Sequence, residues 1–268
     1  MKILITGNKG FIGSHLTKLY KKHQVDMIDI KEGKDLAAIN TNHPKKQYDL
    51  IIHCASQCVV RECIQNPMMA HYNNAFGTLQ LFEYARRNNC KKIIYFSSSR
   101  TLENEENPYT ASKKYGECLC EAYHQCYNID YIIIRPSTVY GEGDNTDRLI
   151  PRFIKNAKQG KTLEIYGDHK KTLDITYIED FINAFKLIMK KGKWNTDYDV
   201  GNGYSISLYY IAYHIRRLLN SKSKIVYKQQ EIAQPQQVKI NNKKIVKLGY
   251  KQKYDFRLAL KRTIRYYK

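Results

Sequence analysis

Tyr109 and Lys113 are the residues whose types and spacing most directly suggest chemistry. They lie four positions apart at the start of a predicted helix, so both side chains project from one face, one turn apart. An ammonium beside a phenol favours the phenolate, and this makes Tyr109 a usable acid and base near neutral pH. Ser97-Ser98-Ser99 follows a predicted strand, where a hydroxyl can hydrogen-bond a reacting alcohol or ketone. Taken singly, each pattern often occurs by chance.

A glycine-rich turn lies near the N-terminus, between a predicted strand and a predicted helix. Its glycines are spaced three apart, at Gly7, Gly10 and Gly13. Such a turn lets the backbone approach a pyrophosphate, while the helix N-terminus supplies free N–H groups and a positive dipole. The spacing alone is a weak signal, but its context between strand and helix is the required one. We therefore predict a dinucleotide site.

Asp29 closes the second predicted strand, downstream of this turn. An acidic side chain there can accept both hydroxyls of an adenosine ribose and would repel a 2′-phosphate, so NAD is favoured over NADP. The alternative is an ordinary turn aspartate at a strand end. Lys31 and Lys34 count against a firm choice of cofactor, because either ammonium could meet a phosphate.

The elements that must position these groups alternate between strand and helix. Short apolar runs predict strands at Lys2–Thr6, Val25–Ile30, Leu50–Cys54, Lys92–Phe96 and Tyr131–Ile134. Helical spacing follows Gly10 and recurs over about 67–87 and about 109–126. This order predicts an α/β fold with a doubly wound parallel sheet of the Rossmann type, covered by helices on both faces.

Two regions are expected in a chain of 268 residues and 31.5 kDa. Residues 1–135, with a returning segment at about 163–192, should form an NAD-binding domain. Residues 136–162 and 193–268 should form a smaller C-terminal substrate-binding region, because glycines and prolines mark frequent loops after Arg135.

The composition excludes several classes of protein. With 43% apolar residues and only 14 Gly and 6 Pro, the chain is neither collagen-like nor disordered. No run approaches the roughly 18 apolar residues of a membrane helix, and the N-terminus turns polar too early for a secretory signal. Seven cysteines without a Cys-x2-Cys pair argue against a disulfide framework and a zinc site. We expect a soluble, cytoplasmic protein with no metal.

The net charge of +20 is concentrated near the C-terminus. Residues 221–268 contain 11 lysines and 3 arginines against Glu231 and Asp255, a net charge of +12. A basic region can bind nucleic acid or an anionic small molecule. No zinc-finger or RNA-binding signature accompanies the charge, so a solvated lysine-rich surface is the better interpretation and a nucleic-acid partner is not expected.

Taken together, these motifs resemble the extended short-chain dehydrogenases/reductases of the NAD-dependent nucleotide-sugar epimerase/dehydratase kind. The resemblance covers nearly the whole chain. It is carried by the Thr-Gly-x-x-Gly-Phe-Ile-Gly opening, Asp35-Leu36, Ile52-His53-Cys54-Ala55-Ser56, Asn74-Ala75-Phe76-Gly77-Thr78, Pro108-Tyr109-Thr110-Ala111-Ser112-Lys113, Arg135-Pro136 with Val139-Tyr140-Gly141, Ile165-Tyr166-Gly167-Asp168 and Leu248-Gly249-Tyr250.

The resemblance implies a role for each matching residue. The family's catalytic serine or threonine falls on Ser98, which joins Tyr109 and Lys113 as a catalytic residue. Asp35 and Leu36 should border the adenine, and Asn74 should lie in a loop beside the cofactor. The full implied cofactor site is Gly7, Lys9, Gly10, Phe11, Ile12, Gly13, Asp29, Asp35, Leu36, Cys54, Ala55, Ser56, Asn74, Tyr109, Lys113 and Pro136. The implied substrate site is Ser98, Thr138, Arg148, Leu149 and Tyr166.

Departures from the family pattern narrow the chemistry. Relatives that dehydrate the sugar carry Asp-Glu directly after the catalytic Ser/Thr, whereas this chain has Ser99 and Arg100. Two arginines that grip the diphosphate correspond to Leu173 and Gln234, and this loss is not conservative. Either the substrate is not a typical sugar nucleotide, or other basic groups hold the diphosphate, among them Arg148, Arg152, Lys170 and the C-terminal lysines.

These observations predict an NAD-dependent nucleotide-sugar 4-epimerase that acts by transient oxidation to a 4-keto sugar. An NAD(P)H-dependent 4-keto-sugar nucleotide reductase fits the missing acid pair equally well, and a 4,6-dehydratase-related enzyme is a further alternative. A non-catalytic dinucleotide-sensing or RNA-associated relative is the alternative outside catalysis. The resemblance also implies a homodimer, formed through the helices around Tyr72–Arg87 and Tyr109–Cys126.

Overall fold

The computed structural model describes residues 1–103, 106–235 and 237–267, and they form two compact units. The first unit contains residues 1–102, 106–135 and 192–198. The second contains residues 136–191 and 199–267, together with Glu103. The expected returning segment at about 163–192 is thereby corrected to 192–198. The reason is that β7 (Leu163–Tyr166) pairs with β12 (Ile225–Lys228) of the second unit, and only the later segment adds a strand to the large sheet.

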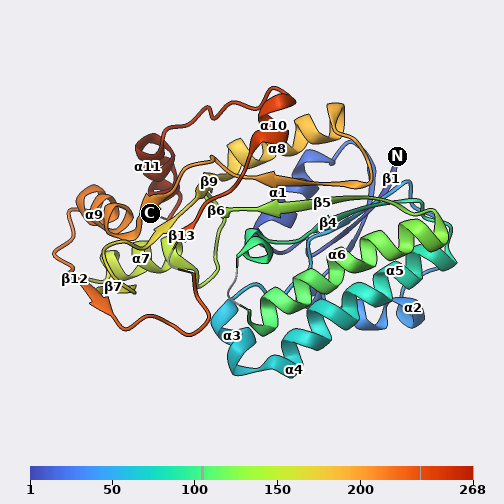
Figure 1. The fold of residues 1–268 in the computed structure, drawn as a ribbon, viewed down its shortest axis with the longest axis horizontal. Coiled ribbons are helices and arrows are strands. Elements are labelled where there is room, and N and C mark those ends of the chain that lie inside the picture. Colours follow the sequence, from blue (N-terminus) through green and yellow to red (C-terminus); the bar gives the residue numbers. More distant parts are fainter. Residues whose placement is uncertain (104–105, 236, 268) are drawn as a thin grey trace. The chain divides into compact units, whose positions relative to one another are not determined.

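The first unit is built on a six-stranded sheet with the strand order β10-β5-β4-β3-β1-β2 (Figure 1). The pairs β1–β2, β1–β3, β3–β4 and β4–β5 are all parallel. The strands are β1 (Lys2–Thr6), β2 (Gln24–Ile28), β3 (Leu50–His53), β4 (Lys92–Phe96), β5 (Asp130–Pro136) and β10 (Thr196–Val200). All five predicted strands are present. The order reverses between β1 and β3, so the carboxyl ends of these strands border the crevice where doubly wound sheets bind ligands.

The sheet is buried on both faces, as its continuous apolar runs predict. On one face Ile51, Ile93 and Ile133 pack against α5 (Gly77–Arg87) and α6 (Pro108–Tyr127). The connection from β1 to β2 runs in the opposite direction along the sheet, so a right-handed crossover places α1 (Phe11–Leu19) on the other face. The predicted Rossmann-type α/β architecture is confirmed.

The remaining helical segments of this unit are short. The predicted helix over 67–87 is divided, because a π-helical segment, His71–Phe76, separates α4 (Pro67–Ala70) from α5. Asn107 caps α6 by accepting a hydrogen bond from the backbone N–H of Thr110 (3.0 Å). The other segments are α2 (Ile39–Asn42), α3 (Val60–Gln65) and the 3-10 turns Ile30–Glu32, Leu36–Ala38 and Ser99–Leu102.

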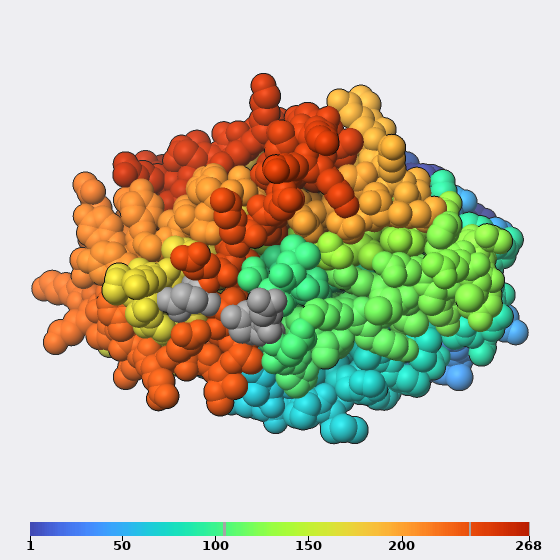
Figure 2. Space-filling model, in the orientation of Figure 1, coloured from blue at the N-terminus to red at the C-terminus, as the bar shows by residue number. Residues whose placement is uncertain are grey.

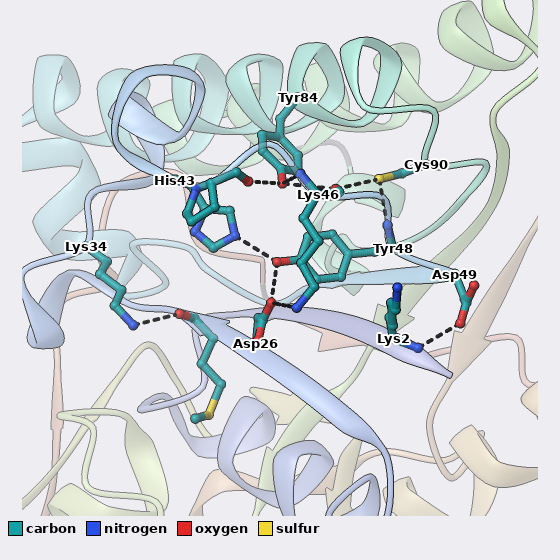
Figure 3. A network of polar contacts seen from close by, with 11 residues as sticks. Lys2, Asp26, Lys34, His43, Lys46, Tyr48, Asp49, Tyr84 and Cys90 are labelled. Atoms are coloured by element: carbon teal, nitrogen blue, oxygen red, sulfur yellow. Dashed lines mark hydrogen bonds and ion pairs between the residues drawn. The ribbon is translucent and has the colours of Figure 1, made fainter.

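A polar network attaches the connection between β2 and β3 to the edge of the sheet (Figure 3). Asp26 on β2 accepts hydrogen bonds from Lys46 Nζ (2.5 Å) and the Tyr48 hydroxyl (2.6 Å). Burial opposes the charge on Asp26, but these two donors hold the pKa of its carboxyl below the usual range. The Tyr84 hydroxyl on α5 donates to the Pro44 carbonyl (2.7 Å). The network thus fixes the long connection that precedes β3.

The second unit is assembled from short strands and amphipathic helices. Its strands form three small sheets: β6 (Thr138–Tyr140) with β9 (Ile175–Tyr177), β7 with β12, and β8 (Thr172–Leu173) between β11 (Ile206–Ser207) and β13 (Gln237–Val238). Its helices are α7 (Leu149–Lys158), α8 (Ile178–Lys191), α9 (Leu208–Leu218), α10 (Lys243–Lys247) and α11 (Phe256–Tyr266). Side chains of the basic C-terminal region, orange to red in Figure 2, lie at the surface of this unit.

Candidate active site

The glycine turn after β1 has no room for a side chain at Gly7 or Gly13. Gly7 adopts a φ of +74°, and a Cβ there would lie 2.6 Å from the backbone nitrogen of Ala55. A Cβ on Gly13 would lie only 2.1 Å from the Gly7 carbonyl oxygen. Gly10 caps α1, so the N-terminus of that helix opens onto the turn. The turn therefore has the close backbone packing and the helix N-terminus that a dinucleotide pyrophosphate requires.

Two polar groups beside the turn suit the remainder of a dinucleotide. Asp29 follows β2, and its carboxylate accepts hydrogen bonds from the backbone N–H groups of Lys9 (2.8 Å) and Lys31 (2.9 Å). Each oxygen still has a lone pair for a ribose hydroxyl. The Asn8 side-chain oxygen is buried and has no hydrogen-bond partner among the residues that the structure describes. Such an acceptor is expected to meet a donor from a ligand or water. The residues present therefore fit the dinucleotide.

The loops around this turn contain other predicted cofactor residues. Asp35 caps a 3-10 turn, where its carboxylate accepts from the Ala37 N–H (2.9 Å) and from the Tyr72 hydroxyl (3.3 Å). Leu36 is buried, and Phe11 and Ile12 begin α1. Burial raises the pKa of the Cys54 thiol above its usual range, so this residue carries no thiolate at neutral pH.

Asn74 holds the loop after β3 in place. Its side-chain oxygen accepts hydrogen bonds from Ser56 Oγ (3.2 Å) and the Gln57 N–H (2.7 Å). Its side-chain nitrogen donates to the Gln57 carbonyl and to Ser112 Oγ on α6, each at 3.1 Å. Asn74 therefore joins the loop that contains Ala55 and Ser56 to the helix that carries Tyr109 and Lys113. The motif included Asn74, but these partners were not predicted.

His53 has a structural role, as its position in a strand suggests. Its ring nitrogens lie 2.7 Å from the Thr6 hydroxyl and 2.8 Å from the Thr78 hydroxyl. Burial lowers the pKa of His53 to about 3, so the ring is neutral. It joins β1 and β3 to α5 beneath the glycine turn.

Tyr109 and Lys113 lie on the first two turns of α6, and both side chains are buried. Lys113 Nζ donates to the Phe96 carbonyl at the end of β4 (2.8 Å) and lies 6.0 Å from the centre of the Tyr109 ring. Ser98 follows two residues after Phe96, and its hydroxyl oxygen accepts from the Arg100 N–H (3.2 Å). The ammonium thus contacts the strand end that leads to Ser98 and lies near the Tyr109 ring.

Burial lowers the pKa of Lys113 to about 8, although the nearby Glu117 carboxylate acts to raise it. Lys113 therefore remains largely protonated at pH 7 but deprotonates within the range where enzymes are assayed. An ammonium in this position can stabilise a phenolate and donate a hydrogen bond to a ribose hydroxyl. This arrangement is suited to moving a proton on and off an alcohol.

The predicted substrate residues belong to the second unit, apart from Ser98. Thr138 begins β6, Leu149 begins α7, and Tyr166 ends β7. Pro136, predicted for the cofactor site, is the last residue of β5. The Arg148 guanidinium is already engaged, because it donates to Asp144 Oδ2 (2.9 Å), Thr146 Oγ1 (3.0 Å) and the Val139 carbonyl (3.2 Å). Because Asp144 partly neutralises its charge and these contacts occupy its donors, Arg148 is a weaker candidate for holding a diphosphate.

Sequence reasoning did not identify a partly buried ion pair beside the Ser98 loop. Glu117 on α6 and Arg135 on β5 form a bidentate pair with distances of 2.8 and 2.7 Å. Glu117 lies four residues after Lys113, on the same helix face, and this spacing is the signal in the sequence that could have pointed to it.

The described part of the chain holds no group of three or more His, Cys, Asp or Glu residues arranged to bind a metal ion.

The chain belongs to the NAD dependent epimerase/dehydratase family, whose model matches residues 3–201, and its cofactor is accordingly NAD. The dTDP-D-glucose 4,6-dehydratase of Homo sapiens is 26% identical, over 100% of this chain and 90% of that protein. The UDP-N-acetylglucosamine 4-epimerase of Methanobrevibacter ruminantium M1 is 25% identical, with a TM-score of 0.85 and coverage of 99% and 97% of the two chains.

A third similar protein is DesIV, a dTDP-glucose 4,6-dehydratase from Streptomyces venezuelae that was solved with NAD bound. Its TM-score is 0.90, its identity is 23%, and the match covers 100% of this chain and 97% of DesIV. At that identity the likeness concerns the fold.

None of the helices in residues 1–103, 106–235 and 237–267 is both long and apolar enough to cross a membrane.

Proposed function

We propose that this protein is a nucleotide-sugar 4-epimerase that oxidises its substrate transiently to a 4-keto sugar. The observation that carries the proposal is the position of the Lys113 ammonium, which contacts the end of β4 and lies beside the Tyr109 ring. In this proposal the first unit binds NAD and the second unit binds the sugar nucleotide.

Tyr109 accepts the proton of the sugar hydroxyl, and the Lys113 ammonium stabilises the phenolate that is needed for this step. Bound NAD supplies the hydride acceptor and later the hydride donor. Ser98 donates a hydrogen bond to the oxygen of the 4-keto sugar and so holds the carbonyl in place. If the ketone presents its other face before reduction, Tyr109 returns the proton and the product is the C4 epimer.

The residues after Ser98 favour this reaction over dehydration. Removal of water across two carbons needs an acid and a base, whereas Ser99 is a buried hydroxyl and Arg100 carries a cation. Both residues lie in the 3-10 turn Ser99–Leu102. The protein should therefore keep the sugar's C6 hydroxyl.

Incubation with UDP-hexoses and UDP-N-acetylhexosamines tests the proposal. We expect interconversion of C4 epimers without accumulation of NADH. Chromatography of the sugar nucleotides measures the epimers, and absorbance at 340 nm measures NADH. Formation of a 4-keto-6-deoxy product would instead identify a dehydratase. Absence of turnover with every sugar nucleotide offered would count against the epimerase.

A 4-keto-sugar nucleotide reductase is the second candidate, because Ser99 and Arg100 suit it equally well. Here the ketone is supplied by another enzyme, and Tyr109 donates the proton that completes the alcohol. Stoichiometric oxidation of NADH or NADPH with a 4-keto-6-deoxy sugar nucleotide would favour this candidate. An absence of cofactor consumption would exclude it.

The pH dependence of the reaction should reflect the deprotonation of Lys113. Activity requires the ammonium, so kcat/KM is expected to fall as the pH rises through about 8. The folded-state pKa lies below that of an unfolded lysine, about 10.4, so the unfolded chain binds more protons between these values. This group's contribution to stability should therefore increase with pH across the same window. A Lys113→Arg protein stays charged there, and its remaining activity should lack this alkaline limb.

Two copies of the chain are proposed to pair through α4, α5 and α6. Met68, Met69, Tyr72 and Tyr115 are large apolar side chains exposed on this group of helices and on the adjoining π-helical segment. The exposed outer side of α6 is visible as the green band in Figure 2. Light scattering should give a mass near twice 31.5 kDa, and Met68→Glu should lower it. A monomeric mass for the unchanged protein would contradict the pairing.

A further inference from the structure

Glu117 lies at the centre of a partly buried polar network around the Ser98 loop. Its Oε1 accepts hydrogen bonds from Arg135 Nε (2.8 Å), Thr101 Oγ1 (3.1 Å) and Ser97 Oγ, and its Oε2 accepts from Arg135 Nη2 (2.7 Å). The side chains of Glu117 and Arg135 are only 14% and 15% exposed. Hydrogen bonds to an ionised group in such surroundings are among the stronger ones in proteins.

The partners of Glu117 flank Ser98 on both sides. Ser97 immediately precedes Ser98, and Thr101 lies three residues after it. The Thr101 N–H donates to the Ser98 carbonyl (3.1 Å), and the Thr101 hydroxyl lies within hydrogen-bond distance of that same oxygen (2.8 Å) as well as of Glu117. One carboxylate therefore holds the short turn that fixes the backbone of Ser98.

Glu117 also lies on α6, the helix that carries Tyr109 and Lys113, which are predicted to be catalytic together with Ser98. Tyr109, Lys113 and Glu117 are spaced four apart on α6, which places them along one helix face. The carboxylate thus connects the Ser98 turn to the same rigid helix that presents the phenol and the ammonium. A shift of about 1 Å between such groups is enough to lower a rate by roughly 100-fold.

We propose that Glu117 is a positioning residue that sets Ser98 relative to Tyr109 and Lys113. This inference rests on the proposed function, in which these three residues act on one sugar hydroxyl. Glu117 acts through Ser97 and Thr101 and does not touch the substrate. A purely structural ion pair would affect stability without a selective effect on the chemical step.

Arg135 makes the inference testable, because it has a second acidic partner. Its Nη1 lies 3.1 Å from Asp197 on β10, so neutralising Glu117 does not leave the guanidinium without a carboxylate. Glu117→Gln should therefore fold. Its amide can accept from Arg135 but cannot accept charge-assisted hydrogen bonds from both hydroxyls.

The experiment compares Glu117→Gln with a matched control, Glu83→Gln. Glu83 lies on α5, where it accepts from Arg86 (2.9 Å) and the Tyr123 hydroxyl (2.7 Å), so the same change removes a similar set of contacts away from Ser98. For Glu117→Gln we expect kcat to fall by about 10- to 100-fold with KM and NAD affinity within about twofold of the parent values. Glu83→Gln should keep the parent kcat.

Hydrogen exchange followed by mass spectrometry supplies a readout that does not depend on turnover. Glu117→Gln should speed exchange in the peptide that contains the Arg100 and Thr101 amides, and Glu83→Gln should leave that peptide unchanged. Unchanged exchange in Glu117→Gln, or faster exchange with the parent kcat, would overturn the inference. If the parent protein turns over no sugar nucleotide, the proposed function fails, and the exchange result still decides whether Glu117 holds Ser98.

Discussion

Replacing Tyr109 with phenylalanine is expected to lower kcat by roughly 10²- to 10⁴-fold, the usual contribution of a positioned acid–base group. Phenylalanine keeps the ring that packs with Cys63 and Ala70 but removes the only atom that can carry the proton. The Lys113 ammonium keeps its hydrogen bond to the Phe96 carbonyl, so the rest of the site should stay in place. Steady-state kinetics with the substrate of the unchanged protein gives the result.

Tyr123→Phe is the matched control for this substitution. Tyr123 lies on the same helix and is similarly buried, but its hydroxyl donates to Glu83 on α5 (2.7 Å). Its loss should change stability by about 1 kcal/mol and leave kcat near the parent value. NAD affinity should be unaffected in Tyr123→Phe. Full activity in Tyr109→Phe would remove Tyr109 from the mechanism.

Gly13→Ala is expected to have the second large effect, on NAD binding. The added Cβ would lie 2.1 Å from the Gly7 carbonyl oxygen, so the turn between β1 and α1 must move. Overpacking of this kind destabilises a protein by about 1–3 kcal/mol. NAD binding should weaken separately. The loss of each charge-assisted hydrogen bond to the pyrophosphate lowers the binding free energy by about 1.5–3 kcal/mol, roughly 10- to 100-fold in affinity. Isothermal titration with NAD and thermal unfolding measure the two effects separately.

Gly77→Ala provides the control for a glycine in the same unit. Gly77 begins α5, and a Cβ there would meet the Leu36 side chain at an ordinary distance of 3.6 Å. Alanine also favours a helix over glycine by about 0.5–1 kcal/mol. We expect unchanged NAD affinity and equal or higher stability. If Gly13→Ala bound NAD as tightly as Gly77→Ala does, the glycine turn would not be the pyrophosphate site.

The sequence predicts the large sheet well because its strands are buried on both faces. Lys2–Thr6 and Lys92–Phe96 are continuous apolar runs, and the observed β1 and β4 have the predicted bounds. The edge strand β10 was missed because Thr196–Val200 alternates aspartate with apolar residues and has no such run. The returning segment was misplaced for a related reason, since pairing partners far away in sequence decide which sheet a short strand joins.

Within the candidate site, motifs suggest the residues but not their partners. The glycine spacing and the Tyr109–Lys113 spacing are local, so the chain itself displays them. The hydrogen bond from Lys113 to Phe96, the four contacts of Asn74 and the pair between Glu117 and Arg135 each depend on the packing of separate elements. Arg148 illustrates the reverse case: the sequence offers it as a cation for the diphosphate, but in the fold it forms an ion pair with Asp144.

The most direct test of the account follows the hydrogen on C4 of the sugar. A UDP-hexose that carries deuterium at C4 should be converted to its epimer with the deuterium still on C4, and kcat should show a primary isotope effect. This result is expected because the hydride leaves C4 and returns to it within one site. Loss of the deuterium to water, or conversion at an unlabelled centre with no isotope effect, would contradict oxidation at C4 by Tyr109, Lys113 and Ser98.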